Sequence, residues 1–428
     1  MIKLLILSDD FTGALDTGVH FAQNGARTKV VFDRDYKFSQ DDDTEVIVID
    51  AETRHLSPEE SYSVIYNIVK RGKEAGVEYY YLKTDSALRG NIGSCLEALL
   101  EASEGKMLPF MPAYPKMNRI TVKGVHYIDN MKVGESVFGK DPFNPVRFSS
   151  VRQIIGQQTK IPCMEVYACK DLNTTDHEEP FIAIYDSVTD MDIRCQAEQL
   201  YQKGMLKIMA GCAGFASVLP DVLKLNRPVK LHMSLRPGVF VISGSINPIT
   251  LNQVSYAVEH GFRYVSVLEI VKKLLIRQDY TFYGSEDFDE IVEICRNTPY
   301  LIIDSSGTLG KNSAMELVRE TGLPLNELRE NIPEILGNIS KSLLDENKYA
   351  TLMITGGDTL IGFLRTMDVH YMNPIEEIMP GVVVSSFMYR GKQYEIITKS
   401  GGFGEKDMFP RLVNYLKRRE GLCWKSIV

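Results

Sequence analysis

Short apolar runs alternate with amphipathic segments in the first half of the chain. Three runs have the length of buried strands, and they cover residues 2–7, 46–50 and 79–83. Apolar residues at helical spacing fill the segment 14–24, which ends before Gly25, a residue typical of the position after a helix. The sequence Ser57-Pro58-Glu59-Glu60 predicts another helix that begins with a capping box. This alternation predicts an α/β fold with a mostly parallel sheet.

A second series of strands follows in the C-terminal half. Its predicted strands each lead into a turn of small residues, and they cover 239–242, 300–304, 351–354 and 394–399. A chain of 428 residues is too long for one ordinary core, so we expect two α/β domains. The basic, proline-containing stretch 224–237 is the best candidate for a linker. The predicted domains are therefore 1–228 and 237–428.

One segment of the first domain breaks the alternation. Residues 109–144 are rich in Pro, Met and Gly and show little periodicity, which predicts a loop-rich excursion that packs near the site. His126 lies in this segment. It either lines the site or is an ordinary buried or surface histidine.

Polar residues follow the first predicted strand. Ligands of parallel sheets bind at the carboxyl ends of the strands, so these residues are candidates for a site. Asp9 and Asp10 stand at this strand end, and Thr12 is expected to cap the next helix. Neighbouring carboxylates can orient a hydroxyl, accept its proton or approach Mg²⁺. The alternative is that one aspartate caps the helix and the other is solvated.

A second polar cluster follows the strand 79–83, in the run Lys83-Thr84-Asp85-Ser86-Ala87-Leu88-Arg89-Gly90-Asn91. Arg89 can hold a carboxylate through two parallel hydrogen bonds, while Asp85 and Ser86 can bind hydroxyls. Arg54, after the second strand, is a further candidate anion contact. This mixture suits a small anionic polyol, and the alternative is a solvated loop.

Glycine turns mark the strand ends of the second domain. Those of interest are Ser243-Gly244-Ser245, Gly356-Gly357-Asp358-Thr359 and Gly401-Gly402. Each alone is consistent with a simple turn, but as a set they fit a phosphate cradle, in which backbone N–H groups approach the anion. Neither a GxxxxGK[ST] loop nor a GxGxxG motif after a strand is present. We therefore expect one domain to hold a sugar acid and the other a nucleotide.

Composition restricts the partners and the compartment. The net charge of −8 argues against a nucleic-acid or anionic-membrane surface. The seven cysteines form no CxxC pair, which favours reduced thiols. No apolar stretch approaches the roughly 20 residues of a membrane span. We expect a cytoplasmic protein with small-molecule ligands, whose oligomeric state the sequence leaves open, a homodimer being one option.

The chain resembles the four-carbon acid sugar kinases, which phosphorylate threonate, erythronate and 3-oxo-tetronate with ATP. The matching segments run in family order along almost the whole chain. They are Ser8-Asp9-Asp10-Phe11-Thr12-Gly13-Ala14, the run from Lys83 to Asn91, Pro112-Ala113-Tyr114-Pro115, Gly124-Val125-His126-Tyr127, Ser243-Gly244-Ser245, Gly356-Gly357-Asp358-Thr359 and Lys399-Ser400-Gly401-Gly402-Phe403-Gly404. Two departures from the family pattern are Ile246-Asn247-Pro248 and Gly402, where many relatives have asparagine.

The resemblance implies an acid-sugar domain, a nucleotide domain and an active-site cleft between them. It implies that the acid contacts Asp10, Arg54 and the segment 86–89, and that ATP contacts Ser243, Ser245, Gly356, Gly357, Asp358, Thr359, Gly401 and Gly402. On this basis we expect transfer of the γ-phosphoryl group from ATP, with Mg²⁺, to the terminal hydroxyl of D-threonate. Asp10 is the expected catalytic base and Asp85 the second candidate, while Arg89, Lys83 and Arg54 hold the carboxylate.

Other functions remain open at this point. D-Erythronate and 3-oxo-tetronate are alternative acceptors, although the run from Lys83 to Asn91 looks more like that of the threonate and erythronate kinases. An NAD-dependent dehydrogenase would also use repeated αβ units and glycine turns, but the GxGxxG motif is missing. A sugar-acid sensor that uses nucleotide only for regulation is a third possibility.

Overall fold

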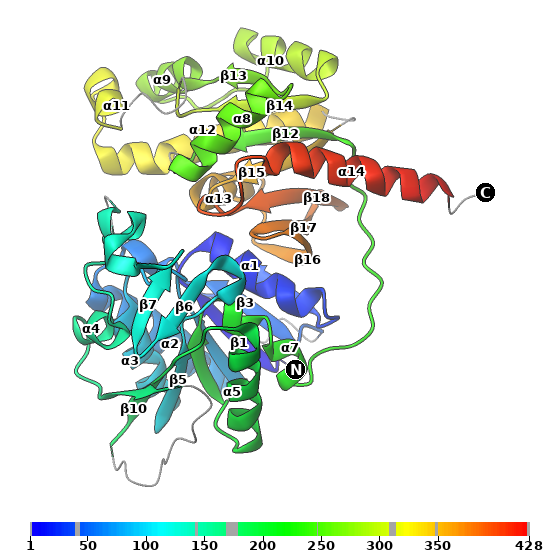
Figure 1. Ribbon diagram of the computed structural model, residues 1–428. Helices are drawn as coiled ribbons and strands as arrows, with labels where there is room; N and C mark the ends of the chain where they lie inside the picture. The colour runs from blue at the N-terminus through cyan, green and yellow to red at the C-terminus, as the bar shows by residue number, and fades with distance from the viewer. Residues whose placement is uncertain are drawn as a thin grey trace. The chain divides into compact units, whose positions relative to one another are not determined.

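The chain forms two compact units, Met1–Lys230 and Leu231–Val428 (Figure 1). The computed structural model describes residues 2–38, 43–141, 144–167, 179–245, 247–307, 314–346 and 350–425. The stretch 224–237, predicted as a linker, contains no helix or strand. None of the helices in the described ranges is long and apolar enough to cross a membrane.

A parallel sheet forms the centre of the N-terminal unit. Its strands are β1 (Leu4–Ser8), β2 (Thr28–Val31), β3 (Val46–Asp50), β4 (Tyr79–Lys83), β5 (Met107–Met111), β9 (Cys163–Val166), β10 (Phe181–Tyr185) and β11 (Ile208–Gly211). They follow the order β2-β3-β1-β4-β11-β5-β10-β9, and each of these pairings is parallel. The predicted α/β class with a mostly parallel sheet is thus confirmed for this unit.

Helices cover this sheet in two groups. They are α1 (Phe11–Ala22), α2 (Pro58–Glu74), α3 (Ile92–Ser103), α4 (Val151–Gly156), α5 (Asp190–Gln202), α6 (Ala213–Ala216) and α7 (Leu219–Val222). Helices α1, α5, α6 and α7 contact one another, as do α2, α3 and α4. The predicted capping box of α2 is present, with both the Ser57 and the Glu60 hydrogen bonds.

The start of α1 differs from the prediction. Asp10, and not Thr12, is the N-cap, since its carboxylate accepts a hydrogen bond of 3.0 Å from the Gly13 N–H. Thr12 lies inside the first turn and donates to Asp10 Oδ2 at 2.9 Å. The charged carboxylate comes two residues earlier and is the stronger acceptor for the free N–H groups of the helix.

The segment 109–144 contains more regular structure than predicted. It includes a small antiparallel sheet of β6 (Arg119–Val122), β7 (Val125–Ile128) and β8 (Met131–Lys132), followed by the 3-10 helices η4 (Val133–Glu135) and η5 (Val137–Lys140). Lys123 and Gly124 form the β6–β7 turn, both with positive φ. Strands of four residues or fewer give little periodic signal, and Lys-Gly is not among the strongest hairpin dipeptides. The prediction of a loop-rich segment was therefore wrong for this part.

The sheet of the C-terminal unit is mixed. Its strands are β12 (Gly238–Ser243), β13 (Arg263–Ser266), β14 (Tyr300–Asp304), β15 (Ala350–Thr355), β16 (Tyr371–Met379), β17 (Val382–Tyr389) and β18 (Lys392–Lys399). They follow the order β13-β14-β12-β15-β18-β17-β16. The first five are parallel, and β17 pairs antiparallel with both β18 and β16. The four predicted strands are confirmed, whereas β13, β16 and β17 were not predicted.

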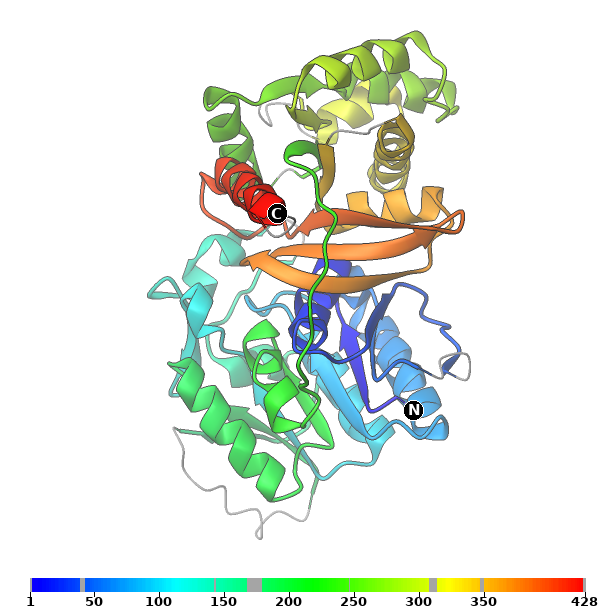
Figure 2. The same ribbon diagram turned by 90° about the vertical axis from the view of Figure 1, so that its right-hand side faces the viewer.

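Helices cover both faces of this second sheet. They are α8 (Pro248–Glu259), α9 (Leu268–Arg277), α10 (Glu286–Asn297), α11 (Ala314–Thr321), α12 (Leu325–Glu346), α13 (Gly357–Thr366) and α14 (Met408–Lys425). Figure 2 shows α14, in red, on one side of the strands and α12 and α13, in yellow to orange, on the other. Helices α8 and α14 share a core with the strands that includes Val241, Ile302, Met353, Ile397, Val254 and Phe409.

The last residue of each central strand ends this apolar core. Because side chains alternate along a strand, the residue two places beyond a core residue lies on the same face. These residues are Asp304, Ser243, Thr355 and Lys399, at the carboxyl ends of β14, β12, β15 and β18, and strand pairing places them in register. We call these four buried residues the polar row.

Candidate functional site

Arg54 joins three loops at the carboxyl ends of β1, β3 and β4 in the N-terminal unit. It lies in the 3-10 helix η2 (Thr53–His55), and its guanidinium donates to Asp9 Oδ2 and Asp10 Oδ2, each at 2.8 Å. A third carboxylate, that of Asp85, is 3.9 Å from Arg54 Nη2. Gly90, with a φ of +84°, packs so closely that an added Cβ would lie 3.1 Å from Arg54 Cγ. The structure thus brings together Asp10, Arg54 and Asp85, which the sequence predicted as site residues.

Arg89 forms a bidentate ion pair with Asp85. Arg89 Nε lies 2.7 Å from Asp85 Oδ2, and Nη2 lies 3.1 Å from Oδ1. The Phe138 ring packs 5.1 Å from the Arg89 guanidinium carbon, and Asp141 Oδ2 accepts from Nη1 at 3.3 Å. Both oxygens of Asp85 are therefore engaged in orienting Arg89.

The three carboxylates around Arg54 differ in their affinity for a proton. Burial raises the pKa of each of them. Attraction by Arg89 and Arg54 more than offsets burial at Asp85, whose pKa is well below its usual value. Attraction by Arg54 and Lys83 lowers the pKa of Asp10, whereas burial prevails at Asp9 and leaves its pKa raised. Cationic neighbours therefore hold Asp85 and Asp10 ionised near neutral pH, whereas Asp9 binds a proton more readily than an ordinary carboxylate does.

Lys83 adds a further cation to the cluster. Its side chain is 5% exposed at the end of β4, and an added Cβ on Gly13 would lie 2.8 Å from its Nζ. Within the described part of the chain, no hydrogen bond and no ion pair within 4 Å holds this ammonium group. Lys83 is thus the cation of the cluster best able to accept an additional anion.

Two further residues position Ser86: Arg119, which was not predicted, and His126, for which lining the site was one of two interpretations. Arg119, on β6, donates from Nη1 to Ser86 Oγ. His126, on β7, contacts the Ser86 carbonyl oxygen with Nε2 and Thr121 Oγ1 with Nδ1, each at 3.0 Å. Burial lowers the pKa of His126 to about 4, so the ring is neutral at physiological pH. His126 thus fixes the backbone of Ser86. The β6–β7 hairpin brings these two residues together, and this hairpin was not predicted from the sequence.

A hollow of about 230 Å³ lies beside Arg89 in the N-terminal unit. Its lining consists of Leu88, Arg89, Gly90, Asn91, Asn144, Pro145, Val146, Arg147, Ile154, Gln157 and Gln158. The hollow includes Arg89 but not Asp10, Arg54, Lys83 or Asp85. Its volume is that of a small ligand rather than of a drug-sized molecule.

The three predicted glycine turns of the C-terminal unit meet at the carboxyl ends of its strands. An added Cβ on Gly244 would lie 2.5 Å from Thr359 Oγ1, and one on Gly401 would lie 3.2 Å from Ser245 Oγ. Thr250, on α8, donates to the Gly401 carbonyl oxygen at 2.9 Å. Segments more than a hundred residues apart in sequence are thus packed around one point. No side chain larger than hydrogen fits at Gly244 without displacing Thr359.

The first turn of α13 offers free backbone donors at this point. Gly356 is its N-cap, with a φ of +100° and no side chain that could accept from the helix. The N–H groups of Gly357, Asp358 and Thr359 open this ten-residue helix, and the first N–H groups of a helix have no partner within it. Such an uncapped N-terminus favours an anion. Asp358 is exposed and Thr359 is buried against Gly244.

Lys399 lies under the turn Gly401-Gly402 and is 1% exposed. Its ammonium donates to the Ser400 carbonyl oxygen at 2.8 Å and to Thr250 Oγ1 at 3.3 Å. Burial lowers the pKa of Lys399 to about 7. The ammonium group of Lys399 is thus buried directly beneath the glycine turn, and it loses its proton more readily than an ordinary lysine does. Lys399 lies in one of the segments that match the family, but no role was predicted for it from the sequence.

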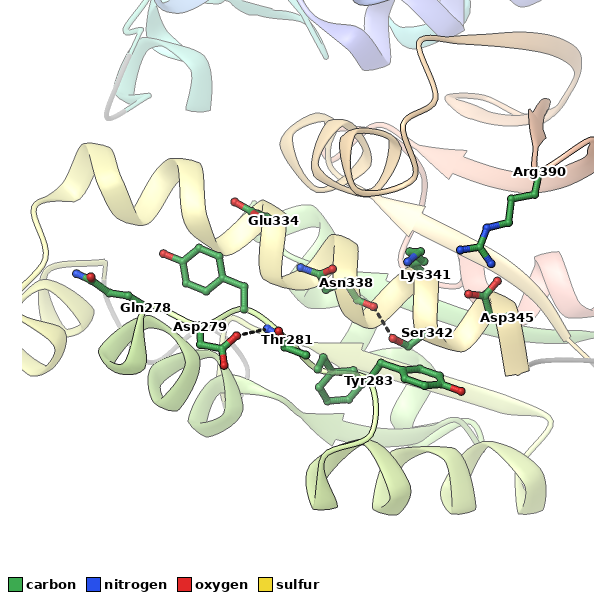
Figure 3. A pocket seen from close by; sticks show the side chains of 12 residues that line it. Gln278, Asp279, Thr281, Tyr283, Glu334, Asn338, Lys341, Ser342, Asp345 and Arg390 are labelled. Atoms are coloured by element: carbon green, nitrogen blue, oxygen red, sulfur yellow. Dashed lines mark hydrogen bonds between the residues drawn. The ribbon is translucent and has the colours of Figure 1, made fainter.

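Another hollow, of about 930 Å³, lies in the C-terminal unit and contains none of the predicted residues (Figure 3). Residues from the end of α9, the segment after it, α12 and the β17–β18 turn surround it. They are Gln278, Asp279, Tyr280, Thr281, Phe282, Tyr283, Glu334, Asn338, Lys341, Ser342, Asp345 and Arg390. Lining groups of both signs, such as Asp345 and Arg390, give it no net preference for an anion. We therefore place the candidate nucleotide site at the glycine turns.

Replacement of Arg54 by methionine should destabilise the N-terminal unit by about 3–5 kcal/mol near pH 7.5, because two buried carboxylates lose their counter-charge. The loss should shrink as the pH falls toward 5, since the carboxylates without Arg54 bind protons more readily in the folded state. Urea unfolding at several pH values measures this. Arg194→Met, which breaks an exposed ion pair with Asp221, is the control and should cost no more than about 1 kcal/mol. Equal losses for both variants at every pH would contradict the role of Arg54.

Two family profiles match the chain. One, described as a sugar-binding N-terminal domain, matches residues 4–219, and the other, described as a nucleotide-binding C-terminal domain, matches residues 240–409. Together they cover both units.

Curated proteins similar to this chain over nearly its whole length are named as kinases of four-carbon acids. A D-threonate kinase of Salmonella typhimurium is 25% identical, over 97% of this chain and 99% of its own. A 3-oxo-tetronate kinase of Pectobacterium atrosepticum is 25% identical, with 96% and 98% covered. A D-erythronate kinase of Heliobacterium modesticaldum is 23% identical, with 97% of each chain covered.

Solved structures share the fold. A protein of Salmonella typhimurium gives a TM-score of 0.74 at 21% identity, with 96% of this chain and 99% of its own covered. A protein of Haemophilus influenzae gives a TM-score of 0.69 at 17% identity, with 96% and 100% covered. On the evidence of both domain profiles and of the full-length relatives, this chain belongs to the four-carbon acid sugar kinase family.

Proposed function

We propose that the chain is an ATP-dependent kinase that phosphorylates the terminal hydroxyl of a four-carbon sugar acid, with D-threonate as the first candidate. One observation gives the strongest support for nucleotide binding by the C-terminal unit. The glycine turns at Gly244, Gly356 and Gly401 pack around one point beside an uncapped helix N-terminus. This arrangement suits phosphate groups.

The N-terminal unit supplies groups suited to the acid. Lys83 carries a buried positive charge that no described residue holds within 4 Å, and Asp85 fixes the guanidinium of Arg89 in one orientation. Either cation can bind the carboxylate of the acid, and Arg89 can still do so through the N–H donors that Asp85 and Asp141 do not occupy. Fixing the carboxylate end would leave the opposite end, with its terminal hydroxyl, available for phosphoryl transfer.

Asp10 is the proposed partner of that hydroxyl. It is ionised near neutral pH, and its side chain is the most exposed of the three carboxylates that face Arg54, at 28%. Asp85 is a weaker candidate because Arg89 occupies both of its oxygens. Asp10 would orient the hydroxyl and accept its proton as transfer proceeds.

The C-terminal unit would stabilise the charge on the transferring phosphates. Backbone N–H groups of the first turn of α13 and the buried ammonium of Lys399 are its proposed contributions. Mg²⁺, when bound, would supply further positive charge at the phosphate oxygens. Membership of a kinase family favours this function over that of a dehydrogenase, for which no GxGxxG motif is present.

The test of the function is ADP release from ATP and Mg²⁺ with D-threonate, D-erythronate, L-threonate and 3-oxo-tetronate supplied separately. We expect turnover with D-threonate to exceed that with the other acids by at least about tenfold. A site that forms hydrogen bonds to the hydroxyls of one acid strongly rejects an acid whose hydroxyls are placed differently. Preference for another of the four acids would retain the kinase and change its substrate. ADP binding by calorimetry without turnover on any of them would indicate a sensor and would overturn the proposed activity.

Replacement of Arg89 by alanine should raise KM for the acid by at least about tenfold and change KM for ATP by less than about twofold, because the contact is made to the acid alone. Arg89→Lys retains the charge without the fork, so its KM should fall between those of the wild type and Arg89→Ala. Steady-state kinetics with each substrate varied in turn measures this. Arg152→Ala, at an exposed position on α4, is the control and should match the wild type. A parallel rise in both KM values would refute the assignment of Arg89.

Nucleotide binding should take up a proton at pH 8 through Lys399. With a pKa of about 7 this lysine is mostly neutral at pH 8, and a phosphate nearby would favour its ammonium form. At pH 6 the lysine is already protonated, so the uptake should be smaller. Titration calorimetry of ADP in buffers of different ionisation enthalpy measures the number of protons. Lys399→Met should abolish the uptake, and Lys406→Met, an exposed control, should not. The same uptake in Lys399→Met would show that another group titrates.

A further inference from the structure

Asp304 occupies a distinctive place in the C-terminal unit. It is the last residue of β14, and strand pairing sets it directly beside Ser243, the last residue of β12. The connection after β12 runs through α8 on one face of the sheet, whereas the connection after β15 runs through α13 on the other. A parallel sheet binds ligands at the carboxyl end between two neighbouring strands whose connections run over opposite faces. The ends of β12 and β15, with Ser243 and Thr355, form such a point, and Asp304 lies beside Ser243 at its edge.

The carboxylate of Asp304 is buried and only half satisfied. It is 1% exposed, and Oδ2 accepts hydrogen bonds from Ser306 Oγ at 2.6 Å and from the Tyr264 hydroxyl at 3.1 Å. Among the residues that the structure describes, its Oδ1 has no hydrogen-bond partner. Ser243 Oγ lies close enough to interact with the Asp304 carboxylate, although no hydrogen bond of normal geometry joins them, and Thr355 Oγ1 has no hydrogen-bond partner among the described residues. Buried polar atoms are nearly always satisfied, so incompletely satisfied oxygens along one row point to a ligand.

A cation would be a suitable partner for the Asp304 carboxylate. In the N-terminal unit, the buried carboxylates Asp9, Asp10 and Asp85 each form an ion pair with an arginine. Asp304 forms no ion pair within 4 Å in the described part of the chain, and its neighbours are hydroxyl groups. Burial of an unpaired carboxylate is costly, and a bound cation would offset that cost.

The chemistry of the surrounding atoms selects the kind of cation. Carboxylate and hydroxyl oxygens are the ligands of hard divalent ions such as Mg²⁺ and Mn²⁺. No group of three His, Cys, Asp or Glu residues that could hold a metal is found among the described residues. Mg²⁺ is commonly bound by one or two carboxylates together with phosphate oxygens and water, so one aspartate suffices where a nucleotide completes the site.

We propose that Asp304, together with Ser243, binds the divalent cation that accompanies the nucleotide. This inference rests on the proposed nucleotide function of the C-terminal unit and assigns the metal its protein ligands. Ser243 Oγ would provide a second oxygen on the strand next to Asp304. Lys399 lies at the opposite end of the polar row, three strands from Asp304 and thus roughly 14 Å away along the sheet. The metal and Lys399 would therefore supply positive charge on both sides of the glycine turns.

The test is the affinity of the intact protein for Mn²⁺, measured by electron paramagnetic resonance in the presence and absence of ADP. For the wild type we expect about one Mn²⁺ per chain with ADP and much weaker binding without it. Asp304→Asn should weaken Mn²⁺ binding in the presence of ADP by at least about tenfold. Its affinity for metal-free ADP, from calorimetry, should stay within about threefold of the wild type, because the ligand lost is that of the metal. Asp289→Asn, at an exposed position on α10, is the control and should bind both ligands normally.

The outcomes separate this inference from the proposed function. Normal Mn²⁺ affinity in folded Asp304→Asn would overturn the inference and leave nucleotide binding intact. Wild-type protein that binds no ADP, with or without Mn²⁺, would overturn the nucleotide function and the inference together. Ser243→Ala removes a small buried hydroxyl and serves as the second variant if Asp304→Asn does not fold. An Mn²⁺ affinity reduced in Ser243→Ala, with metal-free ADP binding retained, would support the inference, and unchanged Mn²⁺ affinity would count against it.

Discussion

Register at the carboxyl ends of parallel strands is the constraint on which both candidate sites depend. Parallel pairing sets Asp50, Ser8 and Lys83 side by side in the N-terminal unit, and Asp304, Ser243, Thr355 and Lys399 in the C-terminal unit. The residues of each row come directly after buried apolar residues of the same strands, so their polar groups are buried as well. Burial makes their charges expensive, and each row must be neutralised by partners.

The two units neutralise their buried charges in different ways. In the N-terminal unit the protein supplies the partners, since Arg54 and Arg89 hold Asp9, Asp10 and Asp85 within one network. In the C-terminal unit Lys399 is stabilised by carbonyl and hydroxyl oxygens, and the carboxylate of Asp304 by hydroxyls. This network fixes the positions of its carboxylates and arginines and leaves Lys83 available for the carboxylate of a small acid. A row with unsatisfied atoms is suited to a ligand that brings both negative charge and a cation.

Local sequence signals were sufficient for the long, regular elements. The capping box at Ser57 and the apolar runs at β3 and β4 appear as predicted, because helix caps and buried strands leave a pattern within a few residues. The short hairpin β6–β7 and the antiparallel pair β16–β17 were missed. Their stability derives from pairing with residues distant in sequence and from packing, and neither appears in a local window. Thr12 was misjudged as the cap because the competing acceptor, Asp10, lies only two residues away.

The sequence alone determined the α/β class, the two strand series and the presence of polar and glycine-rich strand ends, because each depends on local spacing and residue type. Only the tertiary structure decided which of these ends meet. Gly244 contacts Thr359, and Gly401 contacts Ser245, across gaps of more than a hundred residues. The tertiary structure also shows that Arg54 and Arg89 form ion pairs with carboxylates, whereas Lys83 forms none within 4 Å among the described residues. Partnership and burial are properties of three-dimensional packing, and they set the charge and pKa of a group more strongly than its neighbours in sequence do.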